Sequence, residues 1–394
     1  MSNKDISQLF VKSLQTQKLE SSIAKNENKI LLKGLIGSSL SFLVSSIFSK
    51  NQKLTVLILE NKETAAYHFN DLEKLKNNVL FYPESYKNPY TTSNTDNSNI
   101  LLRADVLNKI NSNPNNYLVV THYKALFEKV VTKSELQKNT LNIKVEDELS
   151  IDFINEILFE YEFSRVDFVT QPGDFSVRGG IIDVFSFSND KPYRIEFFGD
   201  EITRIRSFDL ESQLSIKNYC EIKIIPNIQS DIKIENRVNF LDILSPNTSI
   251  FLKNSKYLLK EIKLLFEKSI STYEDFSDST VQLKPQVLFS SSKEIKSSLI
   301  KHKLIEIGSN SIFNDNEIKY DVKPQPSFNK SFELLIENLN NYEKLGFQNY
   351  LCCANEQQKN RFSDIFDNLD LDVNYIPIIL PLYQGFIDND NKIV

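Results

Sequence analysis

A segment near the N-terminus has the glycines and hydroxyls of a phosphate-binding loop. A working loop reads G-x-x-x-x-G-K-[ST]: backbone amides close on the phosphates, the lysine neutralises them and the hydroxyl holds magnesium. Here Gly34 and Ser41 fit that pattern, but Ser39 replaces the second glycine and Leu40 replaces the lysine. The segment therefore predicts a degenerate phosphate loop or an unrelated strand-to-helix turn, and neither supports nucleotide hydrolysis. Its residues are Gly34, Gly37, Ser38, Ser39, Leu40 and Ser41.

Histidine and cysteine are too few and too scattered for metal or nucleophile chemistry. The chain has three of each: His68, His122, His302, Cys220, Cys352 and Cys353. No CxxC pair or histidine pattern has the spacing of a metal site, and three cysteines cannot form a disulfide framework. We therefore expect no catalytic residue, no metal and no bound cofactor in this chain. Reduced cysteines indicate a cytoplasmic protein.

Composition narrows the class of protein further. The chain has 394 residues, of which 41% are hydrophobic and 25% charged, and a formal charge of −6. That length predicts two to four globular domains, and the acidic balance argues against general nucleic-acid binding. The most apolar window, residues 30–48, contains Lys33 and several serines, so no membrane span is expected.

Strand and helix patterns alternate over the first 128 residues. Apolar strands are predicted at 29–33, 54–59, 79–82 and 117–121, with helices between them. Continuous apolar runs such as 54–59 are typical of parallel strands buried on both faces. Residues 1–128 therefore predict the first part of a doubly wound α/β domain.

The periodicity changes after residue 128. A helix is predicted over 150–161, and the segments that follow alternate with a period of two, joined by turn residues such as Gly199-Asp200. This pattern predicts an inserted α+β domain with an antiparallel sheet, spanning 129–215.

The remaining sequence returns to mixed α/β patterns. Residues 216–318 predict the second part of the first domain, with short strands at 222–225, 249–252 and 287–289. The proline-spaced stretch 323–327 predicts a linker. Residues 319–394 predict a small α/β domain that is interrupted at Val394, as in a fragment of a longer protein.

Two segments of the inserted domain carry a family resemblance. The stretch Gln171–Phe185 contains R-G-G-I-I-D-V-F, and Pro192–Glu201 contains R-I-E-F-F-G-D-E. Together they resemble the UvrB-like region of bacterial transcription-repair coupling factors, the Mfd family. The likeness extends to the phosphate-loop segment, Phe81–Glu84 and Pro324–Phe328. UvrB itself has an intact loop and a long DNA-clamping hairpin, whereas this chain lacks the lysine and has only a short polar stretch at 86–99.

The second motif also suggests a binding surface. Alternation along Tyr193–Phe198 places Arg194, Glu196 and Phe198 on one face of a strand. A solvated face with paired charges and an anchor for a protein interface both fit this pattern. The resemblance favours the interface, because this domain of the family docks the damage-recognition protein UvrA. It assigns that role to Arg165, Arg178, Arg194 and Glu196, and position alone adds Phe198.

The resemblance implies a function for the whole family member. Such a protein finds RNA polymerase stalled at a DNA lesion, displaces it with an ATP- and Mg²⁺-dependent duplex-DNA translocase, and recruits UvrA. The polymerase-binding domain and the motor lie C-terminal to this region, which leaves a monomeric, non-hydrolysing recruitment module here. The alternative is a divergent UvrB-type, ATP-dependent helicase fragment that binds damaged DNA. Because the arginines are expected outside the core, replacing Arg178 and Arg194 should remove binding with little effect on stability.

Overall fold

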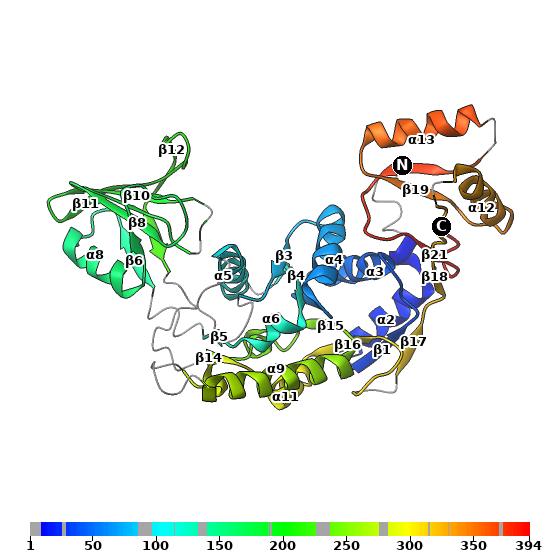
Figure 1. Ribbon diagram of the computed structural model, residues 1–394, viewed down its shortest axis with the longest axis horizontal. Coiled ribbons are helices and arrows are strands. Elements are labelled where there is room, and N and C mark those ends of the chain that lie inside the picture. Colours follow the sequence, from blue (N-terminus) through cyan, green and yellow to red (C-terminus); the bar gives the residue numbers. More distant parts are fainter. Residues whose placement is uncertain are drawn as a thin grey trace.

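The computed structural model describes most of the chain as α/β, with several separate sheets (Figure 1). The described residues are 9–25, 29–85, 97–113, 115–132, 140–187, 189, 191–225, 237–275, 283–313, 316–329, 331–369 and 373–394. Residues 86–96 of the predicted short polar stretch lie outside these ranges.

A seven-stranded, entirely parallel sheet forms the centre of the molecule. Its order is β17 (Glu317–Lys319), β1 (Lys29–Lys33), β16 (Lys303–Ile307), β15 (Ser249–Lys253), β2 (Thr55–Leu59), β4 (Leu118–His122) and β3 (Val79–Tyr82). Every residue of β2 and β4 is buried, as their continuous apolar sequences predict. Segments from both sides of the antiparallel insertion therefore share one sheet.

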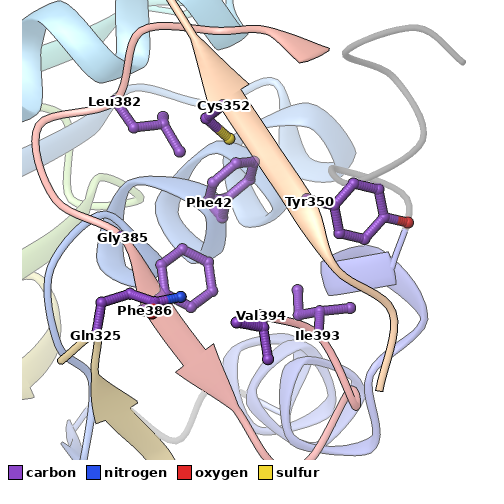
Figure 2. Close-up of a pocket in the computed structure, with 9 residues that line it drawn as sticks. All are labelled: Phe42, Gln325, Tyr350, Cys352, Leu382, Gly385, Phe386, Ile393 and Val394. Atoms are coloured by element: carbon purple, nitrogen blue, oxygen red, sulfur yellow. The ribbon is translucent and has the colours of Figure 1, made fainter. Parts of the chain in front are cut away.

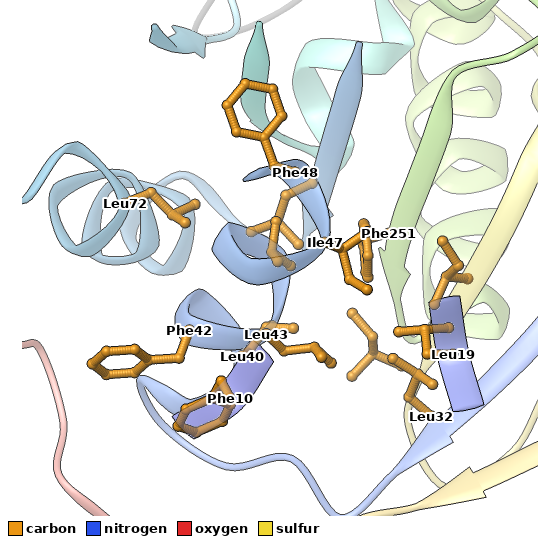
Figure 3. Close-up of a cluster of buried hydrophobic side chains, with 14 of the residues drawn as sticks. Phe10, Leu19, Leu32, Leu40, Phe42, Leu43, Ile47, Phe48, Leu72 and Phe251 are labelled. Atoms are coloured by element: carbon orange, nitrogen blue, oxygen red, sulfur yellow. The ribbon is translucent and has the colours of Figure 1, made fainter. Parts of the chain in front are cut away.

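Helices cover both faces of this sheet. Alternate residues of β2 enter different cores: Leu57 and Leu59 join one, and Val56 and Ile58 join the other. Figure 3 shows the first core, where Leu40, Phe42 and Leu43 lie among its packed side chains. Helices of the parallel-sheet region are α2 (Leu14–Ala24), α3 (Ser39–Asn51), α4 (Lys62–Leu75), α5 (Asn97–Ser112), α6 (Tyr123–Phe127), η2 (Phe240–Ile243), α9 (Ser255–Asp275), α10 (Pro285–Leu288) and α11 (Ser292–Leu299).

The prediction of a strand at 287–289 is wrong. Residues Pro285–Leu288 form the short helix α10, with proline at its first turn, and Phe289 makes only an isolated bridge with Glu128. Proline suits the first turn of a helix because that position needs no backbone N–H donor.

A second, six-stranded sheet stands apart from the first (Figure 1). Its order is β12 (Ser215–Tyr219), β11 (Glu201–Phe208), β10 (Tyr193–Phe198), β9 (Ile181–Val184), β8 (Asp174–Arg178) and β7 (Ser164–Arg165). All neighbours are antiparallel except β7 and β8. Helix α8 (Ile151–Glu160), capped by the Ser150 hydroxyl, packs Ile154 and Leu158 into this sheet's core.

This sheet extends past residue 215, where the sequence predicts the end of the inserted domain. Strand β12 begins there, and β13 (Glu221–Ile224) then pairs with β6 (Leu141–Lys144). Ile222 and Ile143 belong to the same core as α8. The short strands β5 (Val130–Val131) and β14 (Arg237–Val238) pair where the chain enters and leaves this region.

The C-terminal segment forms a smaller α/β unit. Strands β19 (Tyr350–Cys353) and β20 (Ile376–Ile379) are parallel, and helices α12 (Phe332–Lys344) and α13 (Glu356–Asn368) belong to the same unit. The predicted linker at 323–327 is only partly irregular, because β18 (Val322–Pro324) pairs with β21 (Phe386–Asp388). This pairing joins the end of the chain to the segment that follows β17.

Candidate functional site: a closed loop and an exposed arginine face

The phosphate-loop segment lies between β1 and α3, at the carboxyl end of the parallel sheet. Gly34 has φ +87°, and a Cβ atom there would lie 2.0 Å from the backbone oxygen of Tyr320. Gly37 has φ +55°, and its Cβ would lie 3.1 Å from the oxygen of Gln384. Both glycines are therefore needed to let other backbone segments approach the loop.

The loop's own side chains point into the protein. Leu40, at the position of the lysine in a working loop, is 3% exposed and belongs to the core beneath α3 (Figure 3). The Ser39 hydroxyl bonds within the loop, donating to the oxygen of Ile36 at 2.7 Å. The Ser41 hydroxyl lies 2.8 Å from Nδ1 of His68 and donates to Asp71 at 3.1 Å. All three side chains are therefore buried, and the two hydroxyls are bonded within the protein.

A distant part of the chain contacts the loop where an anion would bind. The amide of Ser38 donates to the oxygen of Gln384 at 3.1 Å, and the amide of Gln384 donates to the Ser38 hydroxyl at 3.2 Å. The amide of Tyr383 donates to Asp71 at 2.9 Å, while its ring stacks on Tyr67 at 3.8 Å. The chain itself thus uses a loop amide that a phosphate would require.

Burial favours the neutral form of both titratable groups behind the loop, so it moves their pKa values in opposite directions. Burial, together with the charge of Lys253, lowers the pKa of His68 to about 4. Burial raises the pKa of Asp71, although hydrogen bonds from Ser38, Tyr383 and Ser41 oppose that rise. His68 is therefore neutral near pH 7. Because Ser41 contacts both groups, the three side chains do not form a Ser–His–Asp relay.

A pocket of about 220 Å³ lies beside this contact (Figure 2). Its walls are mainly apolar and come from α3, the end of β18, β19 and the segment around β21: Phe42, Gln325, Tyr350, Cys352, Leu382, Gly385, Phe386, Ile393 and Val394. Burial raises the pKa of the Cys352 thiol to about 12, so the thiol stays protonated near pH 7 and supplies no nucleophile.

The second candidate region is the face of the six-stranded sheet that α8 leaves uncovered. The register places Asp183, Arg194 and Arg206 side by side, with Arg178 and Glu196 in the next row. The Asp183 side chain is only 2% exposed, yet it binds two arginines. Arg194 makes two hydrogen bonds to it, at 2.6 and 2.8 Å, and Arg178 makes another.

Aromatic rings support both arginines. The guanidinium of Arg194 lies 4.4 Å from the centre of the Phe208 ring, and that of Arg178 lies 5.0 Å from the Phe168 ring. The hydrogen bond to Asp183 raises the pKa of Arg194, so the arginine stays charged. Phe208 is buried, but 63% of Phe168 is exposed. The sheet therefore presents a cation and an aromatic ring together.

The predicted contact residues do not all lie together. Glu196 pairs with Arg206 at 2.5 Å, and Phe198 is 80% exposed at the end of β10. Arg165 is exposed on β7, but its register partner is Phe175, whose side chain is buried in the core beneath the sheet. The arginine face, defined here as Arg178, Asp183, Arg194, Glu196 and Arg206 with Phe168 and Phe198, therefore excludes Arg165.

Asp183 also corrects the expected stability of the double arginine variant. Removing Arg178 and Arg194 would leave a buried carboxylate without its two cations, and such a change destabilises a protein strongly. Asp183 could have been found from the motif, because it is the aspartate of R-G-G-I-I-D. No motif or spacing in the sequence points to the other residues of the two regions, which are Phe168, His68, Asp71, Tyr383 and Gln384.

Metal ligation and membrane insertion find no support in the described residues. Within those ranges, no three histidine, cysteine, aspartate or glutamate side chains gather as a metal site would require. Of the helices placed there, none has both the length and the apolar character needed to cross a membrane.

Comparison with known proteins places the arginine face in a known domain. Residues 141–229 match the UvrB interaction domain family. The chain is similar to the transcription-repair-coupling factor of Bacillus subtilis (31% identity, covering 57% of this chain and 19% of that protein) and of Rickettsia bellii (32%, covering 51% and 18%). The match to that of Borreliella burgdorferi is longer (26% identity, covering 86% and 33%).

These alignments span about a fifth to a third of the length of the relatives. The family match begins at β6 and ends just after β13, so it includes the whole six-stranded sheet. The resemblance predicted from the two sequence motifs is thus confirmed: the chain is similar to the UvrB-like region of bacterial transcription-repair-coupling factors and, over residues 141–229, to the UvrB interaction domain.

Proposed function

We propose that this chain is the N-terminal, UvrB-like region of a transcription-repair-coupling factor and that it recruits UvrA without hydrolysing nucleotide. The arginine face is the observation that carries this proposal. It lies within the matched UvrB interaction domain, and it combines the exposed rings of Phe168 and Phe198 with Arg178. Arginine and aromatic side chains held on a rigid sheet are typical anchors of protein interfaces.

The closed loop supports the absence of nucleotide chemistry. Leu40 lies in the core, and the Ser38 amide is bonded to Gln384. A bound nucleotide would have to displace the Tyr383–Gln384 segment and would meet Leu40 in place of the loop lysine. In this proposal the degenerate phosphate loop has a structural role, because it holds the Tyr383–Gln384 segment against the parallel-sheet region. The chain then needs neither ATP nor Mg²⁺.

The proposed role of this region fits into the activity of a full-length transcription-repair-coupling factor. A full-length relative would act at RNA polymerase stalled on damaged duplex DNA and would use a separate ATP-dependent motor. This region would contribute UvrA recruitment as a cytoplasmic, monomeric module. The proposed domains are 1–128 with 216–318, the insertion at 129–215, and the small domain at 319–394; the six-stranded sheet favours a later end for the insertion.

Direct binding tests the proposal. The purified chain is titrated with purified UvrA by calorimetry. A variant carrying Leu345→Ser, an exposed apolar residue at the end of α12 and outside the six-stranded sheet, is the matched surface control. Saturable binding by the wild-type chain supports recruitment, and the absence of binding at micromolar concentrations contradicts it.

A nucleotide experiment separates the proposal from the UvrB-type alternative. We expect no ATPase activity, with or without DNA, and duplex-DNA binding no tighter than about 10⁻⁴ M at physiological salt. Leu40→Lys should not restore ATP binding, and it should lower stability because it buries a charge. DNA-stimulated phosphate release or damage-selective DNA binding would favour the helicase fragment instead.

A further inference from the structure

The two arginines that bind Asp183 differ in how much they offer to a partner. Only 14% of the Arg194 side chain is exposed, whereas 40% of the Arg178 side chain is exposed. Besides its two hydrogen bonds to Asp183, Arg194 donates to Gln213 at 3.1 Å and covers the Phe208 ring. Most of its hydrogen-bonding capacity is therefore used within the domain.

We propose that Asp183 and Arg194 are positioning residues, and that Arg178, held by Asp183, is the cation that meets an acidic side chain of the protein partner. This inference rests on the proposed function, because it assigns roles within the same face. It separates two arginines that the family resemblance treats alike.

The geometry gives Arg178 a fixed position before any partner arrives. Asp183 binds one side of its guanidinium, and the Phe168 ring lies 5.0 Å from it. An arginine ordered in advance loses less side-chain freedom when it binds, so the complex is tighter. Arg194 makes this possible because its two hydrogen bonds fix the orientation of the Asp183 carboxylate.

The pairing of charges around Arg178 indicates the chemistry of the partner. The registers place four arginines (Arg178, Arg194, Arg204 and Arg206) and four carboxylates (Asp174, Asp183, Glu196 and Glu201) on this side of the sheet, so these charges balance. Arg178, whose side chain is 40% exposed, shares its buried carboxylate with Arg194. Asp183 is buried, and Glu196 is paired with Arg206. A carboxylate of the partner is the group that complements Arg178 best.

The variant Asp183→Asn distinguishes positioning from charge by the sign of its effect. It removes a negative charge beside Arg178, so charge alone would make binding to an acidic surface tighter. An asparagine keeps a single acceptor oxygen. With that oxygen at the Oδ1 position its N–H group faces Arg178 and Arg194, and with it at the Oδ2 position the N–H group faces Arg194. In both orientations the charge-assisted bond that holds Arg178 is lost or weakened. We therefore expect Asp183→Asn to weaken UvrA binding about tenfold, measured by calorimetry well below the unfolding temperature.

Salt dependence and a core variant complete the test. Arg178→Ala should weaken binding and also reduce its salt dependence. Asp183→Asn should not reduce the salt dependence, because the cation remains and a negative charge is lost. Ile182→Val, on the same strand but facing the core, controls for general destabilisation and should not change the affinity. Unchanged or tighter binding by Asp183→Asn overturns the inference.

If Asp183→Asn does not fold, Phe208→Leu replaces it. Phe208 is 1% exposed and cannot touch a partner, yet it supports Arg194. We expect a several-fold loss of affinity, and an unchanged affinity overturns the positioning role. A wild-type chain that does not bind UvrA overturns the proposed function, whereas wild-type binding with unaffected variants overturns only this inference.

Discussion

The phosphate-loop segment and the arginine face both have sequences that suggest binding, but they differ in where their polar groups find partners. In the loop, the amide of Ser38 and the hydroxyl of Ser41 bond to other parts of the same chain. On the arginine face, the buried Asp183 holds Arg178 so that part of its side chain remains exposed. A binding motif therefore indicates a site only if its donors are not already used inside the fold.

The largest expected effect is on the arginine face. Arg178→Ala with Arg194→Ala should lower UvrA affinity more than a hundredfold and reduce the free energy of unfolding by about 3 kcal/mol, because Asp183 is left buried and unpaired. Calorimetric titration and urea unfolding measure the two effects.

A third substitution separates contact loss from destabilisation. Adding Asp183→Ser to that double variant should recover much of the stability, because the buried charge is gone, but none of the binding. Recovery of binding by the triple variant would show that the arginines are not contacts.

Replacing one glycine in each region compares the phosphate loop with the arginine face directly. Gly34→Ala should lower the free energy of unfolding by about 3 kcal/mol, because φ is +87° and the new Cβ would overlap the Tyr320 backbone. Gly179→Ala, at φ +58° with nothing within 4 Å, should cost only about 1 kcal/mol. Urea unfolding measures both, and equal losses would mean that the loop is not tightly closed.

Phe198 provides a smaller and purely intermolecular effect. Phe198→Ser should weaken UvrA binding about tenfold, which is about 1.4 kcal/mol, because an aromatic anchor is lost. Stability should change by no more than about 0.5 kcal/mol, since the side chain is 80% exposed. A large fall in thermal stability would place Phe198 in the fold and not in the interface.

A further effect is a pH dependence of stability that arises behind the loop. The pKa of His68 is lowered to about 4, so between pH 6.5 and 4 the unfolded chain binds a proton that the folded chain does not. Stability should therefore fall as the pH falls through this window, by at most about 1.4 kcal/mol per pH unit. The raised pKa of Asp71 offsets part of this fall.

Urea unfolding of wild type and His68→Gln across this pH range tests the prediction. The variant should show a flatter dependence, with a remaining slope from His302, whose pKa burial also lowers. Parallel curves for the two proteins would contradict it.

The sequence predicts local patterns well, because a strand buried on both faces has a continuous apolar run and a strand buried on one face has alternating residues. The buried run at β2 and the alternation along β10 both appear in the structure as predicted. The Ser38–Gln384 contact joins residues 346 positions apart, and such a contact leaves no period to find. Side-chain pairing is equally hidden, which is why the sequence does not distinguish Arg194 from Arg178.

The pairing of β5 with β14 has a consequence for how this protein can be taken apart. Val130–Val131 and Arg237–Val238 lie side by side, so the chain leaves the parallel-sheet region and returns to it at one place. A short glycine bridge between Val131 and Arg237 would therefore excise the six-stranded sheet without opening the seven-stranded one. The excised region has its own hydrophobic core, which includes Phe175 and Ile195. It should therefore fold when it is inserted into another protein as a separate binding domain.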